Sequence, residues 1–289
     1  MKKIIKKLLF ILALAGMTGM LYGCGSEPAS SKDVENGVKK IVVGYASNGY
    51  PLAYQDEDGN YTGYELEVLK EADRRLEDYE FEYVEGAQDA LYAGLGTQKY
   101  DLVVTNAFYT EERAKNYILP EHPLGASLVG LILKKDISGI ATMEDAAKAD
   151  LSLAPILAGD GLYYVVAQYN EENPGNQLEL SATDDAASFM NAVSWIAEGR
   201  YDTAAWPRNY WEQVVKAEDG SLHDYFDELQ FVECRSVYTY PVIAKGQEAL
   251  AEALDPILND LYEEGLLEEL SEQFYGYDVF QYEEGKVTN

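Results

Sequence analysis

The amino-acid sequence predicts an α/β fold in which short strands alternate with helices along the chain. Three observations support this prediction: β-rich apolar runs alternate with amphipathic stretches, turn residues separate them, and 289 residues suffice for one large domain or two lobes. Such alternation is typical of layered folds with mostly parallel sheets, in which ligands bind beyond the carboxyl ends of the strands. The loops expected to reach a ligand span 46–50, 105–113, 155–161 and 205–209.

The N-terminal residues have the pattern of a secretory signal. A lysine-rich start precedes an apolar run over 8–16, which is too short for a comfortable membrane span. Residues 21–24, Leu-Tyr-Gly-Cys, resemble the lipobox of bacterial lipoproteins, which implies a signal peptide over 1–23 and lipidation of Cys24. A plain signal with a coincidental cysteine is the alternative. The small, polar residues over 24–37 predict a flexible tether.

Runs of β-branched and aromatic residues predict the strands. The run over 80–85 alternates two aromatic residues with acidic ones, as expected of a strand with one buried face. The run over 101–105 contains Leu-Val-Val and predicts a buried strand. Strands are expected over 40–46, 80–85, 101–105, 127–133, 151–156, 178–182, 203–206 and 238–244.

Apolar residues at helical spacing predict the helices between these strands. Leucines and an alanine recur on one face of the stretch over 65–76, with basic residues on the other face. A shorter helix is expected over 89–98. A long helical pattern over 250–274 closes the fold and is broken at Gly265.

The composition excludes several classes of function. The formal net charge of -29 argues against a nucleic-acid partner and against electrostatic attraction to anionic lipid. Two cysteines cannot build a disulfide scaffold, and no metal and no cofactor are expected. Because Cys24 is assigned to lipidation, Cys234 is expected to be a buried structural thiol. Paired carboxylates such as Glu65 and Glu67 are expected on a solvated acidic face.

Six motifs between residues 50 and 276, taken in order, resemble those of one protein family. Tyr-Pro-Leu-Ala-Tyr, a glycine turn and Gly-Tyr-Glu-Leu-Glu lead into a helix, Thr-Glu-Glu-Arg matches Thr-x-x-Arg, and Gly-Arg-Tyr-Asp matches Gly-Arg-x-Asp. The family is the bacterial family 3 solute-binding proteins, which serve ABC importers of amino acids. The motifs lie at 50–67, 90–102, 105–113, 199–204, 244–246 and 265–276.

The resemblance implies a two-lobed periplasmic-binding-protein-like fold of type II, in which two α/β lobes are joined by two crossing segments. Lobe 1 is then expected at 38–126 plus 238–289, and lobe 2 at 127–232. The hinge is expected near 125–128 and 232–238. The ligand would lie between the lobes and close the hinge.

Arg113, the arginine of the Thr-x-x-Arg motif, is the residue that the resemblance assigns to the ligand α-carboxylate. A planar guanidinium makes two parallel hydrogen bonds to a carboxylate, which lysine cannot. Thr110 is expected to cap the helix that carries Arg113. The alternative is a surface arginine paired with a nearby acid.

Several other residues are expected at the ligand from their positions in the motifs. Thr105 and Asn106 can bind the ligand amine or carboxylate, whereas Phe108 can only pack. Tyr50 stands next to a position where the family often places an aromatic residue over the ligand, although a core or surface tyrosine is the alternative. Gln88 replaces a frequent pocket aromatic, which suggests a polar ligand side chain.

In the second lobe, Gly159 and Asp160 follow a predicted strand and open a helix. Small residues let a ligand approach the backbone N–H groups, while a simple helix cap is the alternative for Asp160. The acid that usually pairs with the ligand ammonium falls on Pro207 in this chain. Three alternatives follow: another residue holds the ligand amine, the motif is aligned one or more positions away, or the ligand is not an ordinary α-amino acid. Arg208 is a candidate partner for a second carboxylate of a larger ligand.

These observations predict a lipid-anchored extracellular receptor that captures an amino acid for an ABC importer. The chain most resembles the subgroup associated with cystine and related sulfur amino acids, and the resemblance lies in 63–65 with 68–69, in 182–185 and in 198–202. The expected partners are the ligand, two permease subunits with cytoplasmic ATPases, and the outer face of a Gram-positive-type or periplasm-facing membrane through the lipid. A monomer is expected. The alternatives are a sensor without transport and a dehydratase-type enzyme on the same fold.

Overall fold

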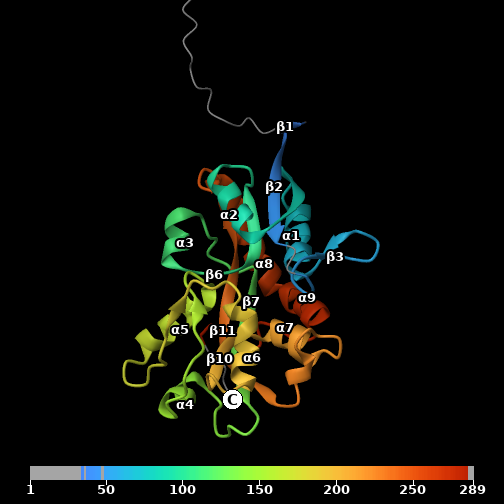
Figure 1. Ribbon diagram of the computed structural model, residues 1–289. Helices are drawn as coiled ribbons and strands as arrows, with labels where there is room; N and C mark the ends of the chain where they lie inside the picture. The colour runs from blue at the N-terminus through green and yellow to red at the C-terminus, as the bar shows by residue number, and fades with distance from the viewer. Residues whose placement is uncertain (1–33, 36, 47–48, 286–289) are drawn as a thin grey trace, which may run out of the picture. The chain divides into compact units, whose positions relative to one another are not determined.

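A mixed seven-stranded β-sheet forms the centre of the structure, a computed structural model that describes residues 34–35, 37–46 and 49–285 (Figure 1). The predicted signal peptide, Cys24 and the part of the predicted tether before residue 34 lie outside the described residues. Val34–Glu35, which belong to the range predicted as a tether, form strand β1 and pair with strand β2 (Val38–Ala46).

More pairs of neighbouring strands in the central sheet are antiparallel than parallel. β2 pairs in parallel with β5 and β6, whereas β11 is antiparallel to β6 and β7, and β10 is antiparallel to β7. The prediction of mostly parallel sheets is therefore wrong for this sheet, because the long strand β11 returns between β6 and β7. The strands of the central sheet are β1 (Val34–Glu35), β2 (Val38–Ala46), β5 (Tyr79–Gly86), β6 (Leu102–Phe108), β7 (Gly125–Lys134), β10 (Thr203–Pro207) and β11 (Leu229–Ile243).

β7 and β11 form the longest antiparallel ladder of the sheet. It runs from Leu229 opposite Lys134 to Thr239 opposite Gly125, with an irregularity between Glu233 and Arg235. The strand predicted over 238–244 therefore begins much earlier, at Leu229. β6 continues the sheet on the outer side of β11, and β10 continues it on the outer side of β7.

Two small sheets complete the strands. β3 (Tyr54–Gln55) pairs with β4 (Tyr61–Thr62), and β8 (Ile156–Leu157) pairs in parallel with β9 (Ala182–Thr183). The strands predicted over 151–156 and 178–182 are therefore only two residues long in the structure, and each begins at the last residue of the predicted range. Pro155 explains the first case, because it has no N–H to donate to a ladder.

The helices begin and end close to the predicted positions. The helix predicted over 65–76 is α1, that over 89–98 is α2, and the predicted break at Gly265 is a left-handed residue with φ 78° between α8 and α9. Among the described residues, no helix is long and apolar enough to cross a membrane. The helices are α1 (Tyr64–Arg75), α2 (Gln88–Gly96), α3 (Glu111–Asn116), α4 (Met143–Lys148), α5 (Gly161–Glu172), α6 (Ser188–Ala197), α7 (Arg208–Tyr210), α8 (Glu248–Glu263) and α9 (Leu266–Tyr275), and a π-helical segment over Trp211–Lys216 and a 3₁₀ turn over His223–Tyr225 follow α7.

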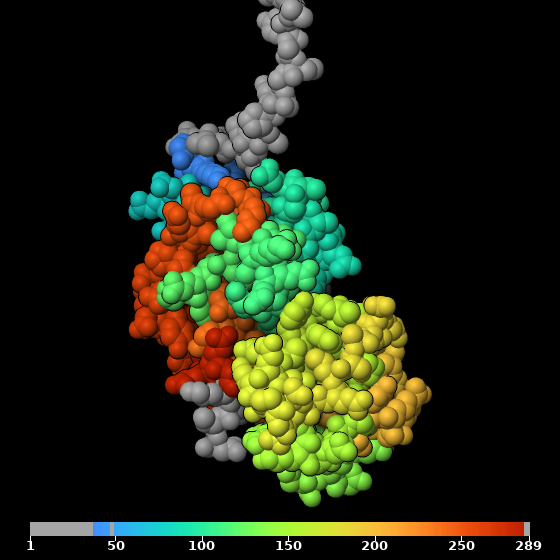
Figure 2. Space-filling model, turned by 90° about the vertical axis from the view of Figure 1, so that its left-hand side faces the viewer, coloured from blue at the N-terminus to red at the C-terminus, as the bar shows by residue number. Residues whose placement is uncertain are grey.

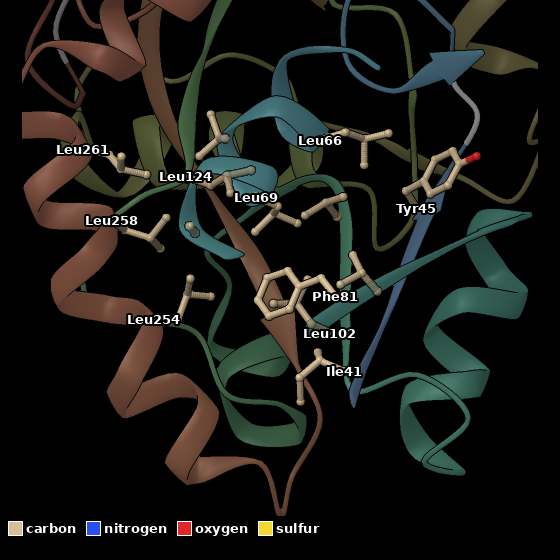
Figure 3. Packing of buried hydrophobic residues seen from close by; sticks show 14 of the residues in the cluster. Ile41, Tyr45, Leu66, Leu69, Phe81, Leu102, Leu124, Leu254, Leu258 and Leu261 are labelled. Atoms are coloured by element: carbon tan, nitrogen blue, oxygen red, sulfur yellow. The ribbon is translucent and has the colours of Figure 1, made fainter. Parts of the chain in front are cut away.

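The buried side chains form separate clusters on different stretches of the chain. In the largest, leucines of α8, including Leu254 and Leu258, point toward Leu66 and Leu69 of α1 and toward the sheet (Figure 3). Burying one such side chain contributes roughly 2 kcal/mol to folding. A second cluster packs α2 against the sheet, and two more hold α4, α5 and α6 against β7 and β10.

Gly63 fixes the start of α1 against the preceding loop. Its φ of 119° and ψ of 161° lie in a region that is essentially restricted to glycine. A Cβ atom there would clash with the carbonyl group of Leu52, whose carbon would lie only 2.7 Å away. The N–H groups of Tyr64 and Glu65 donate to the carbonyls of Pro51 and Leu52, so this approach cannot widen without breaking both bonds.

We expect Gly63→Ala to lower the free energy of unfolding by more than about 2 kcal/mol, because backbone strain and a steric clash act together. Gly59→Ala is the matched control: Gly59 has a φ of 82° but open space around it, so only a loss of about 1 kcal/mol is expected. Urea unfolding followed by circular dichroism measures both values. Equal losses in the two variants would contradict the assignment of a close approach at Gly63.

Candidate functional site

A cavity of about 170 Å³ lies where β6 and β10 end and where α2, α3, α5 and α6 begin. Six of the predicted site residues line it, namely Gln88, Thr105, Asn106, Phe108, Arg113 and Asp160. Pro207 lines it as well. The sequence prediction missed the remaining side chains of this lining, chiefly Tyr92, Leu162, Phe189 and Tyr210.

Arg113 supplies the positive charge of this pocket. The predicted cap is confirmed, because the Thr110 hydroxyl accepts the backbone N–H of Arg113 at 3.0 Å and so fixes the first turn of α3. The guanidinium donates to the carbonyl oxygen of Phe108 and lies 5.6 Å from the ring centroid of Tyr92. Within the described part of the chain, no carboxylate forms an ion pair with Arg113. Its charge is therefore available to a bound anion.

Asp160 supplies the negative charge of the same pocket. Its side chain caps α5 by accepting the backbone N–H of Leu162 at 2.8 Å, so the cap expected as one alternative is present. One carboxylate oxygen is left with no hydrogen bond from the described residues. Burial raises the pKa of Asp160, and the charge of Arg113 opposes that shift. Capping and ligand contact are thus compatible roles of one carboxylate.

Glu65 lies buried behind the pocket and holds its backbone. Its carboxylate accepts the N–H of Asn106 at 2.8 Å, and Asn106 has a left-handed φ of 53° at the point where its backbone lines the pocket. Glu65 is only 2% exposed, and burial raises its pKa to about 7. The expectation that Glu65 and Glu67 share a solvated face is therefore wrong for Glu65. Its flanking residues Tyr64 and Leu66 are also buried, so the start of α1 lies inside the fold.

An aromatic wall closes one side of the pocket. The Phe189 ring stacks on Trp206 with ring centroids 4.5 Å apart, and Tyr210 meets Phe189 edge-on at 5.2 Å. The Trp206 indole N–H donates to the carbonyl oxygen of Phe189 at 3.1 Å, which fixes this stack. Pro207 follows Trp206 and offers no charge to a ligand ammonium. Asp160 is the carboxylate in this lining.

Three of the predicted site residues lie outside this lining. Tyr50 is 51% exposed and meets Tyr54 edge-on. Gly159 lines an adjoining cavity instead, which includes Glu112 and Tyr164. There the Tyr164 hydroxyl donates to the Glu112 carboxylate at 3.2 Å and so links α5 to α3. In Figure 2 the yellow surface of the lower part of the molecule meets the green surface above it.

Arg208, the third of these residues, is engaged by the protein itself. It forms ion pairs with Glu233 at 2.5 Å and Glu212 at 3.5 Å, and its guanidinium lies 3.7 Å from the ring centroid of Tyr277. Tyr282 donates to the other oxygen of Glu233 at 3.3 Å. The structure therefore does not bring Arg208 to the pocket as a second carboxylate clamp.

The remaining reactive side chains have structural partners. His122 pairs with Asp255 at 3.0 Å, and His223 contacts the carbonyl oxygen of Val215. Cys234 is half-buried, its thiol donates to the carbonyl of Val232, and burial raises its pKa to about 12, so it stays protonated. Over the described ranges, no group of three histidine, cysteine or acidic residues is placed to hold a metal ion.

We expect Glu65→Gln to stabilise the protein at alkaline pH. A raised carboxyl pKa means that the folded state keeps its proton between about pH 4.5 and 7 while the unfolded state loses it, so wild-type stability falls as pH rises through this window. Glutamine keeps an acceptor for Asn106 and carries no charge. The variant should exceed wild type by about 1–3 kcal/mol at pH 8 and match it near pH 4.5.

Glu67→Gln is the control on the same helix, since Glu67 is partly exposed to solvent and pairs with Lys70. It should give no gain at pH 8. Urea unfolding at the two pH values provides the measurement, and a Glu65→Gln effect that does not change with pH would contradict the burial of an ionisable carboxyl.

Residues 41–277 match the family model of the bacterial extracellular solute-binding proteins, family 3. The chain is 25% identical over 260 residues to the L-cystine-binding protein TcyJ of Bacillus subtilis, covering 89% of this chain and 91% of that protein.

Solved structures show the same fold. The probable amino-acid ABC transporter extracellular-binding protein YtmK of Bacillus subtilis superposes with a TM-score of 0.64 at 22% identity, covering 83% of this chain and 98% of that one. A second structure comes from work on glutathione import through GshT and the cystine ABC importer TcyBC of Streptococcus mutans. It superposes with a TM-score of 0.61 at 24% identity, covering 83% of this chain and 96% of that one. The fold is thus the two-lobed, type II fold of periplasmic binding proteins. With most of its length matched, the chain belongs to the family 3 bacterial extracellular solute-binding proteins.

Proposed function

We propose that this protein captures a zwitterionic amino acid outside the cell and delivers it unchanged to an ABC importer. One observation carries the proposal: Arg113 and Asp160 line the same cavity with opposite charges and form no ion pair with each other. An α-amino acid carries a carboxylate and an ammonium on one carbon. It therefore satisfies both side chains at once, while either charge alone would remain unpaired.

The carboxylate of the ligand would meet Arg113, because a guanidinium binds it through two parallel hydrogen bonds. The ammonium would meet Asp160, which takes the role that Pro207 cannot perform. Thr105, Asn106 and Gln88 would complete the polar contacts, and Phe108 would pack against the ligand. The raised pKa of Asp160 supports this assignment, since a buried carboxylate gains most from a cationic partner.

We propose that the pocket closes by movement of two lobes, lobe 1 at 38–126 plus 238–289 and lobe 2 at 127–232. Ligand contacts would come from both: Arg113 from the first and Asp160 from the second. The hinge would lie near 125–128 and 232–238, within the paired strands β7 and β11. The bond between Tyr164 and Glu112 would then be one of the contacts made on closure.

We propose cystine or a related sulfur amino acid as the cargo, on the strength of the similarity to cystine-binding relatives. The N-terminal sequence supports secretion with a signal peptide over 1–23 and a lipid on Cys24, followed by a tether. The partners would be two permease subunits with cytoplasmic ATPases. The protein would act as a monomer on the outer face of the membrane.

We expect Arg113→Ala to weaken amino-acid binding by about 2–5 kcal/mol, roughly 30-fold to several thousandfold, because the ligand carboxylate loses its charged partner in the pocket. Arg113→Lys should recover only part of this loss, since lysine cannot bind in a bidentate manner. Isothermal titration calorimetry with L-cystine and the common L-amino acids gives the affinities.

Arg200→Ala is the control, because Arg200 is exposed and its ion-pair partner among the described residues is the nearby Glu198. It should bind as the wild type does. If Arg113→Ala also binds within threefold of wild type, the carboxylate clamp is excluded.

A further inference from the structure

A second, smaller cavity of about 40 Å³ adjoins the charged pocket. The two cavities share Asp160, Leu162 and Phe189, so a ligand held between Arg113 and Asp160 lies at its entrance. A single water molecule needs about 10–15 Å³ of such space. The smaller cavity therefore has room for a few non-hydrogen atoms of a ligand side chain.

Small apolar side chains create this cavity. The neighbouring rings cannot move into the space, because Phe189 is stacked on Trp206 and held by the indole hydrogen bond. Apart from Asp160 at the entrance, none of the described side chains that line the cavity is charged, so a second ionised group would be buried there without a counterion. Four buried alanines contribute to the lining, namely Ala154, Ala192, Ala204 and Ala205.

One buried hydroxyl in this lining lacks a hydrogen-bond partner. Ser188, the first residue of α6, is 1% exposed, and its Oγ contacts no donor or acceptor among the described residues. A buried hydroxyl without a hydrogen-bond partner has lost its hydration without compensation, which is a free-energy cost to the folded protein. A ligand atom in the cavity that donates or accepts a hydrogen bond, such as a thiol, thioether or hydroxyl group, would remove that cost.

We infer that this cavity is the side-chain subsite of the ligand, and that it selects a compact amino acid with an uncharged side chain that carries sulfur or oxygen near Ser188. The inference rests on the proposed capture of an amino acid. It distinguishes between the proposed cargoes: a thiol or thioether amino acid fits, whereas the second charged end of cystine does not.

Calorimetric titration of the wild-type protein with L-alanine, L-cysteine under reducing conditions, S-methyl-L-cysteine and L-cystine tests the inference. L-Alanine reports the contacts of the α-carbon groups alone. We expect the two compact sulfur amino acids to bind at least tenfold more tightly than alanine and more tightly than cystine. Cystine binding more tightly than both would overturn the subsite.

Two variants localise the effect. Ala192→Leu fills the cavity and should reduce S-methyl-L-cysteine affinity at least tenfold while changing alanine affinity less than threefold. Ser188→Ala is nearly isosteric, so it keeps the packing, and it should weaken cysteine more than alanine. Ala141→Leu, at an exposed position outside the cavity, is the control, and thermal melting checks that each variant is folded.

The outcomes separate the two proposals. If Ala192→Leu and Ser188→Ala leave the order of ligand affinities unchanged, the subsite is overturned and amino-acid capture stands. If no α-amino acid binds the folded wild-type protein, amino-acid capture fails and the subsite falls with it.

Discussion

The antiparallel pairing of β7 and β11 is the constraint on which the pocket depends. β6 is attached to β11 with Phe108 opposite Thr239, and β10 is attached to β7 with Pro207 opposite Val129, which in turn faces Arg235. Thr239 and Arg235 lie four residues apart, roughly 13 Å along an extended strand. The ladder thus holds the ends of β6 and β10 at the distance that the pocket spans, and a twist or bend in it would change that distance.

Charge placement gives the pocket its chemistry. Neighbouring arginines and acids elsewhere in the chain neutralise one another, as Arg235 and Glu172 do at 2.9 Å, whereas Arg113 and Asp160 remain apart in one cavity. Helix caps position both residues: the Thr110 side chain caps the helix that carries Arg113, and Asp160 caps α5 itself. With a net charge of -29 on the chain, long-range attraction does not favour anions, so a ligand carboxylate must rely on these local groups.

Features with local causes could be predicted from the sequence, and features with distant causes could not. The cap at Thr110, the break at Gly265 and the loop from Thr105 to Arg113 follow from neighbouring residues. The direction of β11 and the place of Phe189 depend on pairing and stacking across many residues. The burial of Glu65 also has a distant cause. The residues around it predict an exposed acidic side chain, and it is buried by parts of the fold that are far away in the sequence.

The most direct test of the bipolar pocket uses a ligand with each charge removed in turn. Wild-type protein would be titrated in a calorimeter with the best-binding amino acid, its N-acetyl derivative and its C-terminal amide. The account predicts one bound amino acid per chain and at least a hundredfold loss for each derivative, because each leaves Asp160 or Arg113 in the pocket without its charged partner. Undiminished binding of either derivative would contradict the claim that the two side chains hold the two ends of a zwitterion.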